Sequence, residues 1–216
     1  MKRSFKLFDV GFHGDKYLLN LVGAVISNCE FFIETGCNVG STLIYVAKEY
    51  PQIICYSTEP NEHAFKLAKK NTNNLPNVKL FNENSINFLY LLEEYKDIFS
   101  RKVLFWLDAH GYGYDWQLKN EIQFITSRFK HAYIFIDDFK VLNSENFNYF
   151  KHENQECSFE YIEDSIVAEN YELYYPCYEE KTSLHHPLTG WGLIVIEKDK
   201  VFSIPEKLKD YIIKEI

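Results

Sequence analysis

The sequence has little glycine and proline, no paired cysteine motif and no long apolar run. Glycine contributes 9 and proline 6 of the 216 residues, which excludes collagen-like and low-complexity chains. The five cysteines are odd in number and include no C-x-x-C pair, so neither a disulfide framework nor a zinc ribbon is expected. No apolar run approaches the roughly 20 residues of a membrane-spanning helix, and polar residues interrupt the start where a secretory signal needs an apolar segment. These absences favour a cytoplasmic protein with reduced thiols.

Acidic residues outnumber basic ones. Lys and Arg total 23 against 31 Asp and Glu, a net charge of −8, and this sign disfavours nucleic acid as a partner. Apolar residues make up 46% and charged residues 25% of the chain, which is a globular composition. The length suits one α/β domain with a sizeable core and is short for two ordinary domains. We therefore expect one domain over residues 1–216 that binds neither nucleic acid nor a membrane.

Short β-rich apolar runs alternate with stretches of helical periodicity. This alternation is typical of a doubly wound α/β fold, a mostly parallel sheet with helices on both faces. The short linker between the last two strands favours an antiparallel hairpin at the sheet edge. The seven expected strands lie at residues 31–34, 53–57, 78–81, 103–107, 132–136, 171–176 and 192–197.

Three other segments complete the expected architecture. Residues 16–27 are predicted to form a helix that precedes the first strand, and residues 139–170, where the alternation fails, to form a lid or an insertion. Residues 205–216 carry Leu and Ile at helical spacing, which predicts a helix docked on the outside of the domain. Such a helix could pack on its own domain or on a second copy in a homo-oligomer.

The first strand runs into a glycine-bearing turn and then a helix. In a doubly wound sheet this turn opens the ligand crevice, because glycine lets the backbone approach a ligand closely. Gly36 and Gly40 are four residues apart with Asn38 between them, so the dinucleotide fingerprint G-x-G-x-x-G is absent. A nicotinamide-dependent oxidoreductase is therefore disfavoured, although it stays an alternative.

Polar or acidic side chains follow the next strands as well. Glu59 comes about 20 residues after the glycine turn, where an acid can accept both hydroxyls of a ribose. Ser85 follows the third strand, Asp108 the fourth, and Asp137 and Asp138 the fifth. Because ligands of open α/β sheets bind at the carboxyl ends of the strands, these residues predict a binding site there.

With this set of residues the chain resembles the class I S-adenosylmethionine (SAM)-dependent methyltransferases. The match covers residues 31–139, and residues 190–196 are similar to part of the antiparallel hairpin that closes the Rossmann-like methyltransferase fold. The resemblance implies a ribose contact for Glu59, an adenine contact for Ser85 and a place for Asp108 between cofactor and substrate. It also implies that the first strand and glycine turn surround the methionine part of the cofactor, through Glu34, Gly36, Asn38, Gly40 and Ser41.

Within that superfamily the set Asp108, Asp137 and Asp138 is similar to the metal ligands of O-methyltransferases that act on catechols and on macrolide sugars. The resemblance implies Mg²⁺, which prefers hard oxygen ligands, and a small-molecule or saccharide hydroxyl as the acceptor. The catechol type has an Asp-Asn pair and a nearby lysine base, both missing here, so a sugar is favoured over a catechol. His110 is then the candidate base for the acceptor hydroxyl, and Asp108 is the other candidate catalytic residue.

Other interpretations stay open. The same fold could serve a non-catalytic accessory protein that binds a nucleoside. The neighbouring Asp137 and Asp138 repel each other, so a counter-cation is a reasonable resolution, and a Lys or Arg could serve in place of the metal. His13 and the pair His185-His186 are expected to be exposed loop histidines rather than parts of the site.

Overall fold

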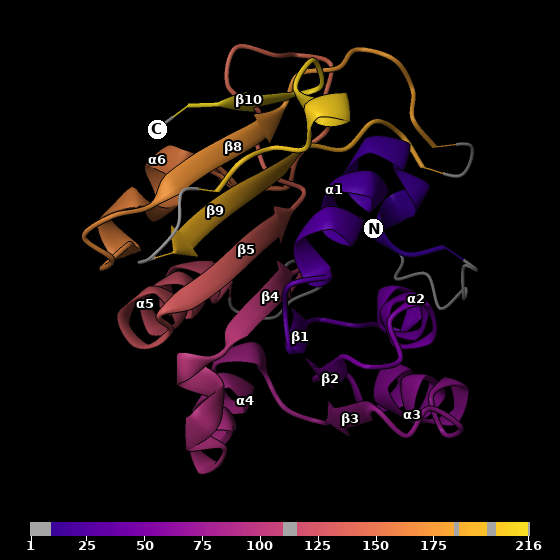
Figure 1. The fold of residues 1–216 in the computed structure, drawn as a ribbon. Helices are drawn as coiled ribbons and strands as arrows, with labels where there is room; N and C mark the ends of the chain where they lie inside the picture. Colours follow the sequence, from indigo (N-terminus) through magenta and orange to yellow (C-terminus); the bar gives the residue numbers. More distant parts are fainter. Residues whose placement is uncertain (1–9, 110–115, 184–185, 198–201, 216) are drawn as a thin grey trace.

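The computed structural model of the chain describes residues 10–109, 116–183, 186–197 and 202–215 (Figure 1). Its described residues form an eight-stranded sheet in the order β10-β8-β9-β5-β4-β1-β2-β3. The strands of this sheet are β1 Phe31–Thr35, β2 Ile54–Thr58, β3 Val78–Phe81, β4 Lys102–Leu107, β5 His131–Asp137, β8 Glu172–Pro176, β9 Trp191–Glu197 and β10 Ile212–Lys214.

Helices cover both faces of the sheet. Figure 1 shows α1, α2 and α3 on one face and α4 and α5 on the other, with α6 beside α5. The helices are α1 Lys16–Ile26, α2 Ser41–Glu49, α3 Glu62–Asn71, α4 Ser85–Leu91, α5 Leu118–Arg128 and α6 Phe159–Ile162. Short 3₁₀ turns are η1 Phe12–Gly14, η2 Leu92–Glu94, η3 Lys96–Ser100, η4 Glu163–Ser165 and η5 Glu206–Leu208. None of the helices in the described part of the chain is long and apolar enough to cross a membrane.

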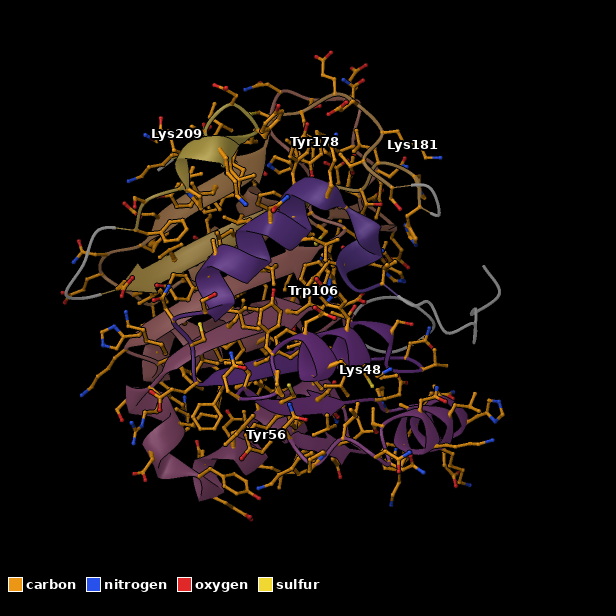
Figure 2. All side chains as sticks on the ribbon, turned by 45° about the vertical axis from the view of Figure 1, so that its right-hand side comes forward. Lys48, Tyr56, Trp106, Tyr178, Lys181 and Lys209 are labelled. Atoms are coloured by element: carbon orange, nitrogen blue, oxygen red, sulfur yellow. The ribbon has the colours of Figure 1, made fainter. Side chains whose placement is uncertain are left out.

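The central strands are buried on both faces, as expected for parallel strands between helix layers. Every residue of β4 after its first is buried, and so is every residue of β5 after its first. Trp106, labelled near the centre of Figure 2, lies in β4 and packs edge-on against Phe12 with ring centroids 4.9 Å apart. This contact brings the segment ahead of α1 onto the sheet.

The sequence predicts the fold class correctly. The five parallel strands form where expected, β9 pairs antiparallel with β5, and β8 pairs antiparallel with β9. Helix α1 also matches its predicted segment, and Asp15 caps it by accepting hydrogen bonds from the backbone of Tyr17 and Leu18.

Two details of the C-terminal part were wrong. The hairpin is not at the sheet edge, because an eighth strand, β10, pairs antiparallel with β8. The predicted helix over 205–216 is replaced by η5 and β10. A short helix is marginal by itself, whereas a strand here satisfies the open edge of β8 and buries Ile212.

Residues 139–170, predicted as a lid or insertion, contain a small separate sheet and a short helix. Strands β6 Lys151–His152 and β7 Gln155–Glu156 form the sheet, and α6 and η4 follow. The backbone N–H of Phe150 donates to the carbonyl of Asp138 at 2.8 Å, and that of Lys140 donates to the carbonyl of Cys157 at 2.6 Å. These bonds hold the segment against the end of β5; its action as a lid stays a prediction.

Two neighbouring isoleucines of β10 provide a test of this C-terminal strand. Ile212 is buried, at 3% exposure, while Ile213 is 49% exposed. We expect Ile212→Ala to lower the free energy of unfolding by about 2 to 4 kcal/mol, the usual cost of truncating a buried aliphatic side chain. Ile213→Ala, the matched control, should cost far less. Urea denaturation of both variants measures the difference, and equal losses would contradict the docking of β10.

Candidate active site

Four acids lie side by side at the carboxyl edge of the sheet. In the spatial order β2, β1, β4, β5 they are Glu59, Glu34, Asp108 and Asp137. Strand β1 pairs in parallel with β2 and β4, and β4 with β5, so these strands end together. The backbone N–H of Asp108 donates to the carbonyl of Thr35 at 3.0 Å and continues the edge between β1 and β4. The strand order reverses at this point, which is where open α/β sheets bind their ligands.

The turn after β1 requires glycine at its first position. Gly36 has a φ of +81°, and a Cβ there would lie 2.6 Å from the carbonyl oxygen of Asp108. Asn38 and Gly40 also have positive φ, at 52° and 89°, and Ser41 begins α2 immediately after them. The turn therefore brings the backbone of β1 close to the end of β4 without a side chain between them.

Glu59 joins this turn to the start of α3. Its side chain is fully buried, one carboxylate oxygen accepts from the backbone N–H of Asn38 at 2.9 Å, and the other accepts from that of Asn61 at 2.8 Å. The backbone contacts hold the carboxylate in one orientation.

Burial and mutual repulsion change the protonation of two other acids. Burial raises the pKa of Glu34 to about 8; the hydroxyl of Ser57, which donates to Glu34 at 2.8 Å, acts against this rise and the charge of Glu59 adds to it. Burial and the charges of Asp137 and Asp138 raise the pKa of Asp108 well above its ordinary value. Both carboxyls therefore hold a proton more tightly than exposed acids do.

Asp137 is paired with a histidine from the other end of the chain. Nε2 of His13 lies 2.8 and 2.7 Å from the two carboxylate oxygens of Asp137, which is 2% exposed. Burial lowers the pKa of His13, but the charge and hydrogen bond of Asp137 outweigh it and raise that pKa to about 9. The expectation of an exposed loop histidine at this position was wrong. Nothing near position 13 in the sequence indicates a contact with residue 137, because the pairing arises only when η1 folds over β4.

His186 lies next to His13. The two imidazole rings have centroids 4.2 Å apart at an interplanar angle of 36°, and burial together with the charge of His13 lowers the pKa of His186. The sequence-based expectation of an exposed residue was wrong here too, since this ring is half-buried. His110 and His185 lie outside the described residues.

The described residues do not fit the predicted Mg²⁺ site. Asp108, Asp137 and Asp138 do come to one edge, but no three His, Cys, Asp or Glu side chains in the described ranges are arranged to hold a metal. Both oxygens of Asp137 already contact His13, and one also accepts from the backbone N–H of Asp138 at 2.8 Å. A metal would have to displace the imidazole.

The start of α4 supplies one more predicted site residue. Ser85 is the first residue of α4 and is 4% exposed. The cap is its neighbour Asn84, whose side-chain oxygen accepts from the backbone N–H of Asn87 at 2.9 Å, so Ser85 is not needed as the cap. Thr35, which no sequence pattern singles out, has a buried hydroxyl oxygen with no hydrogen-bond partner among the described residues.

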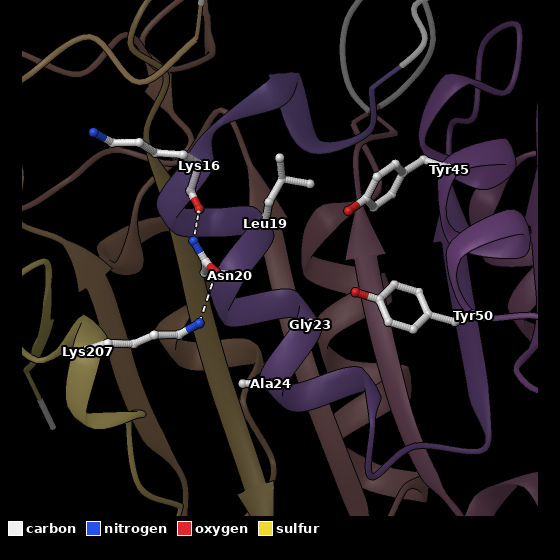
Figure 3. Close-up of a pocket in the computed structure, with 8 residues that line it drawn as sticks. All are labelled: Lys16, Leu19, Asn20, Gly23, Ala24, Tyr45, Tyr50 and Lys207. Atoms are coloured by element: carbon white, nitrogen blue, oxygen red, sulfur yellow. Dashed lines mark hydrogen bonds between the residues drawn. The ribbon is translucent and has the colours of Figure 1, made fainter.

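A groove of about 590 Å³ lies elsewhere, beside α1, and includes none of the predicted site residues (Figure 3). Nζ of Lys207 donates to Asn20 at 3.1 Å, and Asn20 donates to the carbonyl of Lys16 at 2.7 Å. Some of the polar groups that line the groove are thus hydrogen-bonded to each other. The lining residues are Lys16, Leu19, Asn20, Gly23, Ala24, Tyr45, Tyr50 and Lys207.

Solved O-methyltransferase structures have the same fold. The O-methyltransferase from Bacillus cereus in complex with S-adenosylhomocysteine (SAH) matches with a TM-score of 0.62 and 15% identity, over 89% of this chain and 84% of that one. The O-methyltransferase TomG from Streptomyces achromogenes, involved in tomaymycin synthesis and solved with SAM, matches with a TM-score of 0.60 and 11% identity, over 85% and 80%. No protein-family model and no curated protein matches the chain. The comparison shows that this chain has the Rossmann-like methyltransferase fold.

Glu34 provides a test of the electrostatics at this edge. Its pKa of about 8 in the folded protein exceeds the ordinary 4.5, so its contribution to stability is fully present below pH 4.5 and is lost as the pH rises through 8. We expect the melting temperature of the wild type to fall more steeply than that of Glu34→Gln between about pH 5 and pH 9. Thermal melts across this range measure the slopes. Glu94→Gln, at an exposed position, is the control, and parallel curves for wild type and Glu34→Gln would contradict the assignment.

Proposed function

We propose that this chain is a SAM-dependent methyltransferase that methylates a hydroxyl oxygen of a small-molecule or sugar-containing acceptor. The observation that carries the proposal is the junction of Glu59, Asn38 and the turn at Gly36 at the strand-order reversal. It combines an oriented carboxylate with a backbone open to close approach. The fold is the one in which the two O-methyltransferases above hold SAH and SAM.

The residues fit the parts of this cofactor. Glu59 would accept the ribose hydroxyls, Ser85 would face the adenine, and the backbone from Gly36 to Ser41 would surround the methionine part. The unpartnered hydroxyl of Thr35 is a further polar group at that turn.

In methyl transfer the main task of the protein is to hold the cofactor and the acceptor in the right geometry. Bound SAM would supply an activated methyl group for transfer to the acceptor oxygen, with SAH as the other product. The hydroxyl proton must pass to a base. Asp108 lies at the end of β4 beside the glycine turn, and its raised pKa makes it a stronger proton acceptor once it is ionised. His110 stays the second candidate base.

Titration of SAH into the purified protein tests the proposal by isothermal calorimetry. We expect micromolar binding for the wild type and a loss of at least about tenfold, near 1.4 kcal/mol, for Glu59→Ala, because the ribose loses its acceptor and the turn loses its hold on Asn38. Glu62→Ala, an exposed acid on the first turn of α3, should bind like the wild type.

Other outcomes would favour the alternatives. Absence of heat and of a thermal shift in the wild type would contradict the proposal, and NADH binding detected by fluorescence would then favour an oxidoreductase. Tight SAH binding with no methyl transfer from SAM to a panel of saccharides and other alcohols would favour a non-catalytic nucleoside-binding protein.

A further inference from the structure

His13 is held in an unusual backbone conformation. Phe12 and His13 have φ values of 51° and 57°, a region that non-glycine residues adopt only when the surrounding structure fixes them. Phe12 is fully buried and lies edge-on to Trp106 and Tyr45. The N–H of Gly14 donates to the carbonyl of Gly11 at 2.9 Å and closes the turn. The packing of Phe12 thus sets the direction of the next side chain, that of His13.

A buried network fixes the other side of the same turn. Asp15 caps α1 with one carboxylate oxygen and accepts from the hydroxyl of Tyr178 with the other. That hydroxyl accepts in turn from the indole N–H of Trp191 at 3.0 Å, and Trp191 pairs in register with Asp137 across β5 and β9. The segment ahead of α1 is therefore linked to the strand end that carries the partner of His13.

The ring of His13 lies among acidic groups from two elements. Asp137 contacts Nε2 directly, while Asp138 and Asp15 add negative charge from β5 and from the N-cap of α1. His186 is the other titratable group against the ring, and it stays neutral more readily than an exposed histidine. A buried carboxylate such as Asp137 needs a counter-charge, and here an imidazolium ring meets both of its oxygens.

We propose that His13 takes the place of a divalent cation beside Asp137 and Asp138, so that this edge of the site is positioned by an ion pair and not by a bound metal. Mg²⁺ and the His13 ring would compete for the same carboxylate oxygens. Mg²⁺ needs free oxygens in near-octahedral geometry and gives up its waters reluctantly, whereas both oxygens of Asp137 contact Nε2 of His13. His13 is thereby a positioning residue for the acceptor side of the site.

The inference deepens the proposed function and rests on it for its meaning. A metal selects acceptors that offer two neighbouring oxygens for chelation. Because the Asp137 carboxylate is paired with His13, this edge offers no such chelation. The acceptor class therefore includes alcohols that lack a vicinal diol.

Binding of Mn²⁺, followed by electron paramagnetic resonance, tests the ion pair without needing an acceptor or a cofactor. With wild-type protein we expect the free-Mn²⁺ signal of protein-free buffer at submillimolar metal. His13→Ala removes the imidazole from the carboxylate of Asp137, so its Mn²⁺ affinity should exceed that of the wild type by about tenfold or more. His152→Ala, which removes an exposed histidine of β6, should behave like the wild type.

A second variant keeps the test decisive if His13→Ala does not fold. His13→Gln keeps a side-chain donor but no charge, and it should also gain Mn²⁺ affinity while circular dichroism reports the native fold. Micromolar Mn²⁺ binding by the wild type that is lost in Asp137→Asn would overturn the proposal. So would folded His13 variants that bind Mn²⁺ no better than the wild type. SAH titration of the same preparations separates these results from a failure of the proposed function, because a lost cofactor site leaves the Mn²⁺ comparison intact.

Discussion

Repulsion between acids buried at one edge of the sheet is the constraint on which the site depends. The parallel register of four strands brings Glu59, Glu34, Asp108 and Asp137 together, and four unscreened negative charges there would be very unfavourable. Different groups of the chain stabilise or neutralise these charges. Backbone N–H groups bind Glu59, raised pKa values favour protons on Glu34 and Asp108, and His13 pairs with Asp137. The repulsion at this edge is therefore relieved within the chain itself.

The glycine turn at Gly36 and the turn at His13 both shape this edge of the sheet, in opposite ways. At Gly36 a missing side chain lets the end of β4 approach β1. At His13 a bulky residue is held at positive φ, so that its ring reaches Asp137. The second conformation costs free energy, and the burial of Phe12 against Trp106 offsets that cost. Packing in the core thus determines the charge distribution of the site.

Local sequence patterns are sufficient for the features that depend on neighbours along the chain. Alternating strands and helices, the turn at Gly36 and the acids after each strand follow from periodicity and spacing, and they predicted the fold class and the edge where Glu59 and Asp108 lie. The features that were mispredicted depend on distant contacts. Ile212 belongs to a strand only because β8 offers an open edge, and His13 contacts Asp137 across 124 positions of sequence. No local pattern encodes such partners.

The fold by itself does not determine which cation stands beside the end of β5. The two O-methyltransferases compared share this fold, yet this chain is only 11% to 15% identical to them. The counter-charge of Asp137 comes from a segment ahead of α1 that belongs to neither the sheet nor the glycine turn. This segment lies apart from Glu59 and Gly36, which belong to the glycine turn and its contacts. Under the proposed function, acceptor positioning by His13 would therefore vary independently of cofactor binding by Glu59.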